Sequence, residues 1–300
     1  MTQSTEHLIV LFIPALPLMF TFFILVAGWI NRKLCYFVSV TAILLQLVFA
    51  LSILNHVLTK ETIHYWVGGG KPPWGIEYVV DALDAYVLVI FLFLSVIFVL
   101  YSKRSIEQET PQKIGAFYAI YQLLVTGLWG VAVIGDLLYM YWFIELISLS
   151  AYALIALRGW MALKASCVYF LAWLIGSHIL LTGMRFLYAI AGTYNMHDLS
   201  LILPSFYGNN GVQMAFVFFI VGLTLKMAFF PLYTWLLDAH AFGPPKISAI
   251  MSGIIILVST YLFMKPILSV FTLDFIKYIP LNTLIPGIAA IFVILGSILA

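Results

Sequence analysis

Charged residues are scarce in this chain. Asp, Glu, Lys and Arg make up 9% of its 300 residues, whereas hydrophobic residues make up 64%, and the mean hydropathy is +1.11. So little charge excludes a water-soluble domain, because too much apolar surface would face water. We therefore expect a lipid bilayer around most of the chain.

Cysteines and cofactor motifs are also scarce. The two cysteines, Cys35 and Cys167, each lie in or beside an apolar segment, which favours small packing residues over a disulfide or a metal pair. No motif for a redox centre is found, so we expect no cofactor, no metal and no catalytic residue in this chain. The first apolar run lacks a basic segment before it and a small-residue cleavage site after it, which favours a retained helix over a signal peptide.

Long apolar runs fill the remaining sequence. Each approaches the roughly 20 residues that an α-helix needs to cross about 30 Å of hydrocarbon. They predict an all-α, polytopic transmembrane helix bundle of about nine spans, at residues 7–30, 34–58, 84–102, 115–134, 137–157, 166–190, 211–236, 247–264 and 281–300.

Lysine and arginine in the connections predict the orientation, because these residues collect in cytoplasmic loops. With the N-terminus outside, the inside loops hold Arg32, Lys33, Lys103, Arg104, Lys113, Arg158, Lys164 and Lys246, and the outside loops hold Lys60, Lys71, Lys265 and Lys277. This excess predicts a multi-pass protein of the cell (inner) membrane with its N-terminus outside.

Two longer connections fall on the outside in this topology. The first, residues 59–82, contains Gly68-Gly69-Gly70 and Pro72-Pro73, which favour turns over helix and predict an extended or hairpin excursion. The second covers residues 191–210. Neither is long enough to form a soluble domain.

Two ionisable residues interrupt the predicted spans. Glu145 lies in the fifth span, about 12 Å from its start at 1.5 Å per residue, and Lys226 lies in the seventh. Each unpaired charge would cost about 2.5 to 3.5 kcal/mol in the membrane, and such groups usually pair and line a pathway. We therefore predict an ion pair between Glu145 and Lys226.

Pro231 follows Lys226 in the same span and predicts a break in the seventh helix, since proline cannot donate a hydrogen bond to the carbonyl of Met227. A broken transmembrane helix needs protein or water around its freed backbone groups, so a hydrated pocket is expected there. Moving Glu145 away would then favour loss of the lysine's proton, which is a switch for proton translocation. In the alternative interpretation, the pair only holds two helices together.

His178 is a further titratable residue within a span, where a histidine could relay protons. We favour the alternative that it hydrogen-bonds a neighbouring helix. Asp136, between the fourth and fifth spans, is expected to cap the fifth helix rather than carry protons.

Three stretches carry motifs. The first contains Gly135-Asp136, Glu145 and Ser148-Leu149-Ser150-Ala151-Tyr152. The second contains residues 225–236, followed by Asp238-Ala239-His240 and Ser248-Ala249. The third contains Gly75-Ile76-Glu77, followed by Asp81-Ala82-Leu83. Their order and spacing resemble the antiporter-like subunits shared by respiratory complex I, Mrp-type sodium/proton antiporters and membrane-bound hydrogenases, over most of the chain.

The resemblance implies a half-channel in which Glu145 is the carboxylate and Lys226 the lysine of the broken helix, with Asp238 and His240 toward the inner end of the pathway. Two of the sequence's departures from the family bear on the pathway. Val168 stands where the family usually has a lysine, although Lys164, one turn earlier, could partly substitute.

The second departure is Leu257, which stands where hydrogenase- and Mrp-like members have a lysine, so no acid, base or lysine is expected inside the eighth span. Family members also continue through a second inverted repeat, whereas this chain ends within the ninth predicted span. We thus expect three parts: the first three helices with the outer loop in residues 1–114, a five-helix repeat in 115–264, and the start of a second repeat in 265–300.

Together these features predict an ion-translocating (H+ or Na+/H+) antiporter-like subunit of a redox-driven or Mrp-type complex. The expected partners are other membrane subunits, antiporter-like paralogues among them, and the lipid bilayer, with no nucleic acid. The alternative is a non-conducting scaffold subunit of the same membrane arm, which Val168, Leu257 and the missing second repeat favour.

Overall fold

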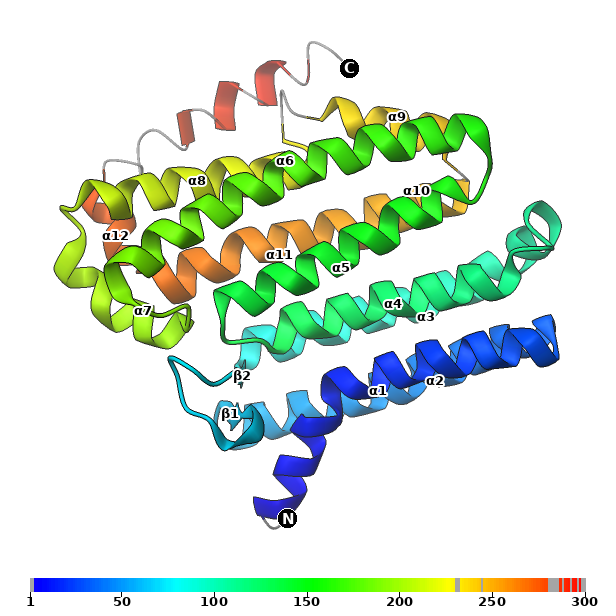
Figure 1. Ribbon diagram of the computed structural model, residues 1–300, viewed down its shortest axis with the longest axis horizontal. Coiled ribbons are helices and arrows are strands. Elements are labelled where there is room, and N and C mark those ends of the chain that lie inside the picture. Colours follow the sequence, from blue (N-terminus) through cyan, green and yellow to red (C-terminus); the bar gives the residue numbers. More distant parts are fainter. Residues whose placement is uncertain are drawn as a thin grey trace.

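The chain folds into a bundle of long helices with a small β-hairpin at one end (Figure 1). The structure is a computed structural model and describes residues 3–229, 233–243, 245–279 and the short pieces 286–287, 289–291, 293–295 and 297. The longer helices are α1 (Gln3–Ile30), α2 (Arg32–Thr59), α3 (Ala82–Glu109), α4 (Ile114–Val133), α5 (Leu137–Ala156), α6 (Trp160–Ala191) and α8 (Asn210–Lys226).

The later part of the described chain is a helical run with two irregular turns. Helix α9 (Thr234–Phe242) precedes α10 (Pro245–Ile250), α11 (Ile256–Pro266) and α12 (Thr272–Tyr278). Two π-helical turns, η3 (Met251–Ile255) and η4 (Ile267–Phe271), join α10 to α11 and α11 to α12. The run from Pro245 to Tyr278 is therefore one span of 34 residues.

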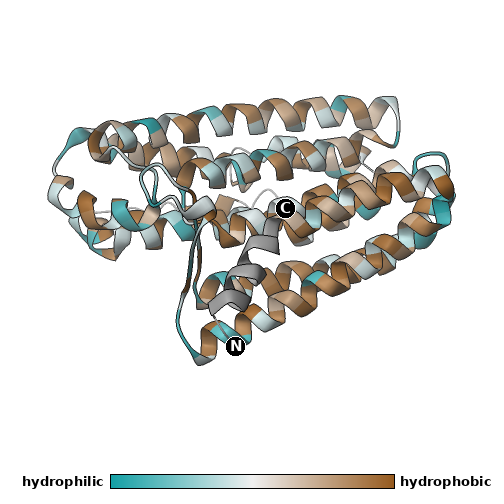
Figure 2. Cartoon of the chain, turned by 60° about the horizontal axis from the view of Figure 1, so that its bottom comes forward, coloured by the Kyte–Doolittle hydropathy of each residue, from teal (hydrophilic) through white to brown (hydrophobic). Residues whose placement is uncertain are grey.

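Length and composition suit these helices to a membrane. Within the described residues, six helical segments are long and apolar enough to cross it, namely α2, α3, α4, α5, α6 and the run Pro245–Tyr278, and two shorter apolar helices are Ala15–Ile30 and Asn210–Lys226. Apolar residues run along the helices, and the most polar ones gather at the connections (Figure 2). Large apolar side chains such as Phe22 and Val48 are more than 60% exposed, as expected of a lipid-facing surface.

The predicted spans agree with the observed helices for most of the chain and fail at its end. The eighth span was predicted too short, at 247–264, and its helical run continues past Lys265 and Lys277 to Tyr278. Lys265 is thus not a residue of an outer loop but a buried residue of α11. Most of the ninth predicted span, 281–300, lies outside the described residues.

The predicted hairpin is confirmed in the first long connection. Strands β1 (Ile63–Trp66) and β2 (Glu77–Val80) pair antiparallel, joined by a short 3-10 turn, η1 (Val67–Gly69), and the loop that follows it. The buried carboxylate of Glu77 accepts a hydrogen bond of 2.6 Å from Asn195 Nδ2 and lies 2.9 Å from His64 Nδ1. The hairpin is therefore tied to the second long connection.

That second connection contains helical structure. It holds α7 (Met196–Ile202) and a 3-10 turn, η2 (Leu203–Phe206). Asp136 caps α5, because its carboxylate accepts hydrogen bonds from the amides of Leu138 and Tyr139, which confirms the predicted cap. The hairpin, the α4–α5 connection and α7 lie at the same end of the bundle (Figure 1).

Candidate functional site

Glu145 and Lys226 meet in the structure, with a serine between them. Lys226 Nζ lies 3.6 Å from Glu145 Oε1. Lys226 Nζ donates a 2.6 Å hydrogen bond to Ser177 Oγ, and Ser177 Oγ donates to Glu145 Oε1. The three side chains come from α8, α6 and α5, so they form a chain of polar groups across three helices.

The two charges differ in exposure. The Lys226 side chain is fully buried, whereas 29% of the Glu145 side chain is exposed. Glu145 opens into a cavity of about 280 Å³ that Trp142, Tyr152 and Trp173 help to line. The carboxylate is therefore the more accessible member of the pair.

An aromatic cluster encloses the lysine. Its Nζ lies 4.1 Å from the centroid of the Trp173 ring, a distance at which a cation is attracted to the ring face. The rings of Tyr169 and Trp235 pack against Trp173 and each other. Because the ammonium has a carboxylate, a hydroxyl and an aromatic face around it, its burial does not leave the charge uncompensated.

The break in the seventh span begins directly after Lys226. Helix α8 ends in a Schellman motif, in which the Phe229 amide donates to the Thr224 carbonyl and the Ala228 amide donates to the Leu225 carbonyl. Ala228 has a φ of 52°, the left-handed conformation that this motif needs. Pro231, the predicted cause of the break, lies outside the described residues.

Two glycines let α6 and α8 approach closely enough to join Ser177 to Lys226. A Cβ placed on Gly222 would lie 2.9 Å from the Gly176 carbonyl oxygen, and one on Gly176 would lie 3.1 Å from the Gly222 oxygen. Small residues at a helix–helix contact allow such backbone proximity in membranes. Close packing here therefore sets the distance between the serine and the lysine.

The other predicted site residues lie away from the central pair. His178 is exposed on α6, and its Nδ1 lies 2.8 Å from the Leu174 carbonyl of the same helix. The prediction that His178 hydrogen-bonds a neighbouring helix was therefore wrong. Lys164 is exposed near the start of α6, 5.7 Å from the Trp160 ring. Asp238 and His240 are half-buried on α9.

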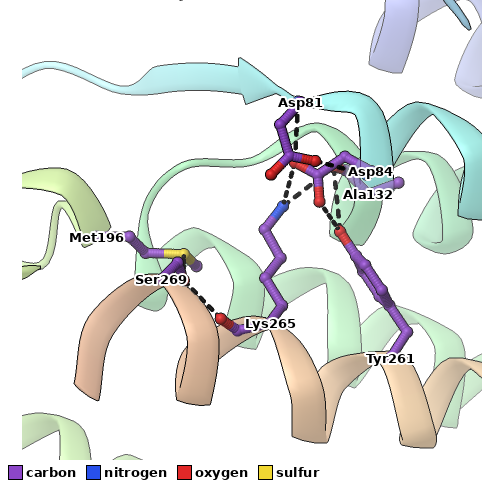
Figure 3. A network of polar contacts seen from close by, with 7 residues as sticks. All are labelled: Asp81, Asp84, Ala132, Met196, Tyr261, Lys265 and Ser269. Carbon is purple, nitrogen blue, oxygen red and sulfur yellow. Dashed lines mark hydrogen bonds and ion pairs between the residues drawn. The ribbon is translucent and has the colours of Figure 1, made fainter. Parts of the chain in front are cut away.

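Two features were missed in the sequence. Ser177 stands in a Gly-Ser-His run, and its inward position depends on the rotation of α6. The second is a buried ion pair between Asp84 and Lys265, joined by Tyr261 (Figure 3). The expectation of an eighth span without an internal lysine was wrong, because the apolar run before Lys265 ends earlier than the helix does.

Comparison with known proteins places these residues in a family. Residues 135–300, more than half of the chain, match the family described as NADH:quinone oxidoreductase/Mrp antiporter, TM. The chain is 37% identical over 212 residues to NADH-quinone oxidoreductase subunit N of Desulforudis audaxviator, covering 71% of this chain and 42% of that one. It is 30% identical to a Na(+)/H(+) antiporter subunit of Bacillus subtilis, covering 89% and 54%, so it spans about half the length of these curated relatives.

Solved structures agree with the family match. A chain of the membrane-bound sulfane sulfur reductase, an archaeal respiratory membrane complex, superposes with a TM-score of 0.79 at 28% identity, covering 86% of this chain and 53% of that one. The Mrp complex from Dietzia sp. DQ12-45-1b shares the fold, with a TM-score of 0.80 at 24% identity over 90% and 50% of the two chains. The protein is therefore a membrane-embedded, multi-pass member of the NADH:quinone oxidoreductase/Mrp antiporter transmembrane family.

Proposed function

We propose that this chain is an ion-translocating, antiporter-like subunit of a multisubunit membrane complex, carrying H+ or exchanging Na+ for H+. The observation that carries the proposal is the chain of polar groups from Glu145 through Ser177 to Lys226 at the end of a broken helix. Intramembrane ionisable groups are costly and usually belong to ion pathways. The relatives named above, whose names describe quinone oxidoreductase and antiporter subunits, support the same function.

The geometry offers a simple switch. Glu145 can accept a proton from the cavity beside it. Neutralising the carboxylate weakens its attraction for the buried ammonium, so Lys226 then gives up a proton more readily. Once Lys226 has given its proton to an acceptor outside the pair, Ser177, which lies between the two as both donor and acceptor, can pass the proton of Glu145 to the neutral amine.

Partners and orientation belong to the same proposal. We expect the chain to sit among other membrane subunits, antiporter-like paralogues included, with its N-terminus on the outer side. Large exposed apolar residues along the bundle suit contact with lipid or with such subunits. Asp238, His240, Lys164 and His178 remain proposed parts of the wider pathway.

Replacing Glu145 with Gln and Lys226 with Ala in the assembled complex tests the function. We expect each variant to lower ion uptake into vesicles by about a hundredfold, the usual contribution of a positioned proton-transfer group. The matched control is Lys277→Gln with Asp274→Asn, which removes an exposed ion pair of 3.3 Å. If the complex assembles and uptake is unchanged, the transport role is wrong.

A scaffold role is the second candidate. The resemblance implies lysines at the places of Leu257 and the exposed Val168, so a lateral path that needs those lysines would be interrupted in this chain. If the substitutions at Glu145 and Lys226 impair only assembly of the complex, and the complex that does assemble transports normally, the ion pair holds helices together and the scaffold role is favoured.

A further inference from the structure

A second buried charge pair lies near the hairpin end of the bundle. Lys265 Nζ of α11 lies 3.2 Å from Asp84 Oδ2 of α3, and both side chains are less than 8% exposed. Tyr261 donates its hydroxyl to the other oxygen of Asp84. Lys265 also donates a 3.1 Å hydrogen bond to the carbonyl of Ala132 in the last turn of α4. Figure 3 shows Tyr261 and Lys265 of α11 and Asp84 of α3 meeting beside Ala132 of α4.

A cavity leads from this pair to the surface. Its volume is about 400 Å³, and Asp81, Asp84, Lys265 and the histidines His64 and His197 help to line it. Asp81 and His197 are exposed, and 44% of the His64 side chain is exposed. The cavity is large enough for water, and polar side chains line part of it, so the buried pair has a route lined by polar groups to the hairpin end of the bundle.

The helix that carries Lys265 is irregular at that residue. Pro266 follows it directly and has no N–H to donate, so the carbonyl of Leu262 loses its helical partner. The π-turn η4 begins one residue later, and such turns are frequent at functional sites. Lys226 stands in a similar setting, because α8 ends there. Lys226 and Lys265 thus each face a carboxylate of another helix at a helix irregularity.

Helix α11 also touches the first pair. Ser259 Oγ donates a 3.3 Å hydrogen bond to the carbonyl oxygen of Lys226. Ser259 precedes Lys265 in the same helix, by about 9 Å along its axis at 1.5 Å per residue. Helix α11 therefore contacts the backbone of Lys226 and carries Lys265.

We propose that Asp84, with Lys265 and Tyr261, is a second protonatable site, which exchanges protons with water in the cavity at the hairpin end of the bundle. In the loading step a water-borne proton binds the Asp84 carboxylate and forms a neutral carboxylic acid. Lys265 keeps its proton and its hydrogen bond to Ala132, and unloading is the reverse reaction. No electron is transferred.

The surroundings of Asp84 fit this exchange better than a purely structural role. Besides Lys265 and Tyr261, the titratable groups that share its cavity are Asp81, His64 and His197. A sealed ion pair would contribute little more to stability than well-packed apolar residues, whereas a pair beside a wet cavity can be loaded and unloaded. Only the expected effect on ion uptake rests on the proposed function.

Infrared difference spectra of the assembled complex in vesicles, recorded between high and low pH, test the site directly. We expect a carboxylic-acid C=O band that Asp84→Asn removes and that the control Asp274→Asn, at an exposed position of α12, retains. Tyr261→Phe removes only the hydroxyl and should shift the band, because the acid loses a hydrogen-bond donor. This second variant decides the question if Asp84→Asn does not assemble.

The outcomes separate this site from the first one. A spectrum unchanged by Asp84→Asn, or a band unmoved by Tyr261→Phe, would overturn the proposal. If the Asp84 band persists in Glu145→Gln, the second site is supported whether or not that variant transports normally. Normal transport by Glu145→Gln would contradict only the proposed function. We also expect Asp84→Asn to slow ion uptake about a hundredfold and to abolish its dependence on the pH of the hairpin-side compartment.

Discussion

Ser177 joins the buried Lys226 and the partly exposed Glu145 into one connected site. It lies on the inward face of α6, while its neighbour His178 is exposed. Its hydroxyl accepts a hydrogen bond from Lys226 and donates one to Glu145. A serine between a lysine and a glutamate can lower the cost of separating them, because it remains a partner for either group when the other leaves.

Replacing Ser177 with Ala should therefore slow ion uptake. Lys226 would lose its 2.6 Å acceptor, and loss of a hydrogen bond to a charged group costs about 1.5–3 kcal/mol, equivalent to roughly tenfold or more in rate. Ser177→Thr keeps the hydroxyl and should retain more activity than Ala. Vesicle uptake by assembled complexes measures the effect, with Ser252→Ala on an exposed serine as the control.

Equal uptake by the Ala and Thr variants at residue 177 would contradict the bridging role. It would mean that Glu145 and Lys226 act through their direct 3.6 Å contact alone. A loss of assembly in Ser177→Ala, but not in Ser177→Thr, would assign the hydroxyl a structural role instead.

At the level of helices, the contact between α6 and α8 positions the site. These helices pack together more extensively than any other pair in the described part of the chain. Their backbones approach each other at Gly176 and Gly222, where neither helix has a side chain. Periodicity predicts that both helices exist, but it does not predict that these two glycines face each other.

Replacing Gly222 with Ala should push the two helices apart. The new Cβ would lie 2.9 Å from the Gly176 carbonyl oxygen, and overpacking of this kind costs about 1–3 kcal/mol. The matched control is Gly253→Ala, where a Cβ meets nothing within 4 Å. Thermal unfolding of the purified complex in detergent should show a lower transition temperature for the first variant only.

Ion uptake by Gly222→Ala should fall together with its stability, because separation of α6 from α8 lengthens the hydrogen bond between Ser177 and Lys226. A Gly222→Ala complex as stable and active as Gly253→Ala would show that the close approach does not set the geometry of the site.

The whole molecule has two unlike ends. The hairpin, the α4–α5 connection and α7 lie at one end, and the connections α1–α2, α3–α4 and α5–α6 lie at the other (Figure 1). The second end carries most of the basic residues, and Arg158 there donates a 2.9 Å hydrogen bond to the Gly243 carbonyl. By the positive-inside rule, we propose that this basic end faces the cytoplasm.

Cysteine labelling tests that orientation. In a background with Cys35→Ala and Cys167→Ala, we expect Trp74→Cys at the hairpin end, where the native side chain is 91% exposed, to react with a membrane-impermeant maleimide in intact cells. Gln108→Cys, at an exposed position of the opposite end, should react only after the membrane is permeabilised. The reverse pattern would place the N-terminus inside.

Much of the architecture follows from the amino-acid order alone. Long apolar runs predict the helices because a bilayer requires each spanning segment to satisfy its own backbone hydrogen bonds. Gly68-Gly69-Gly70 and Pro72-Pro73 predict the hairpin region, and the isolation of Glu145 and Lys226 in apolar runs predicts that they pair. These inferences succeed because each depends on local composition or on the high cost of an unpaired charge in lipid.

The contacts between helices could not be predicted in the same way. Ser177 enters the site because α6 turns it inward, and Lys265 pairs with Asp84 from a helix far away in the sequence. Hydropathy placed Lys265 in a loop, because a lysine ends an apolar run in the sequence whether or not the fold provides a carboxylate to pair with it. Rotation and packing of helices depend on side chains of several segments at once, so the serine bridge and the second ion pair are properties of the assembled bundle.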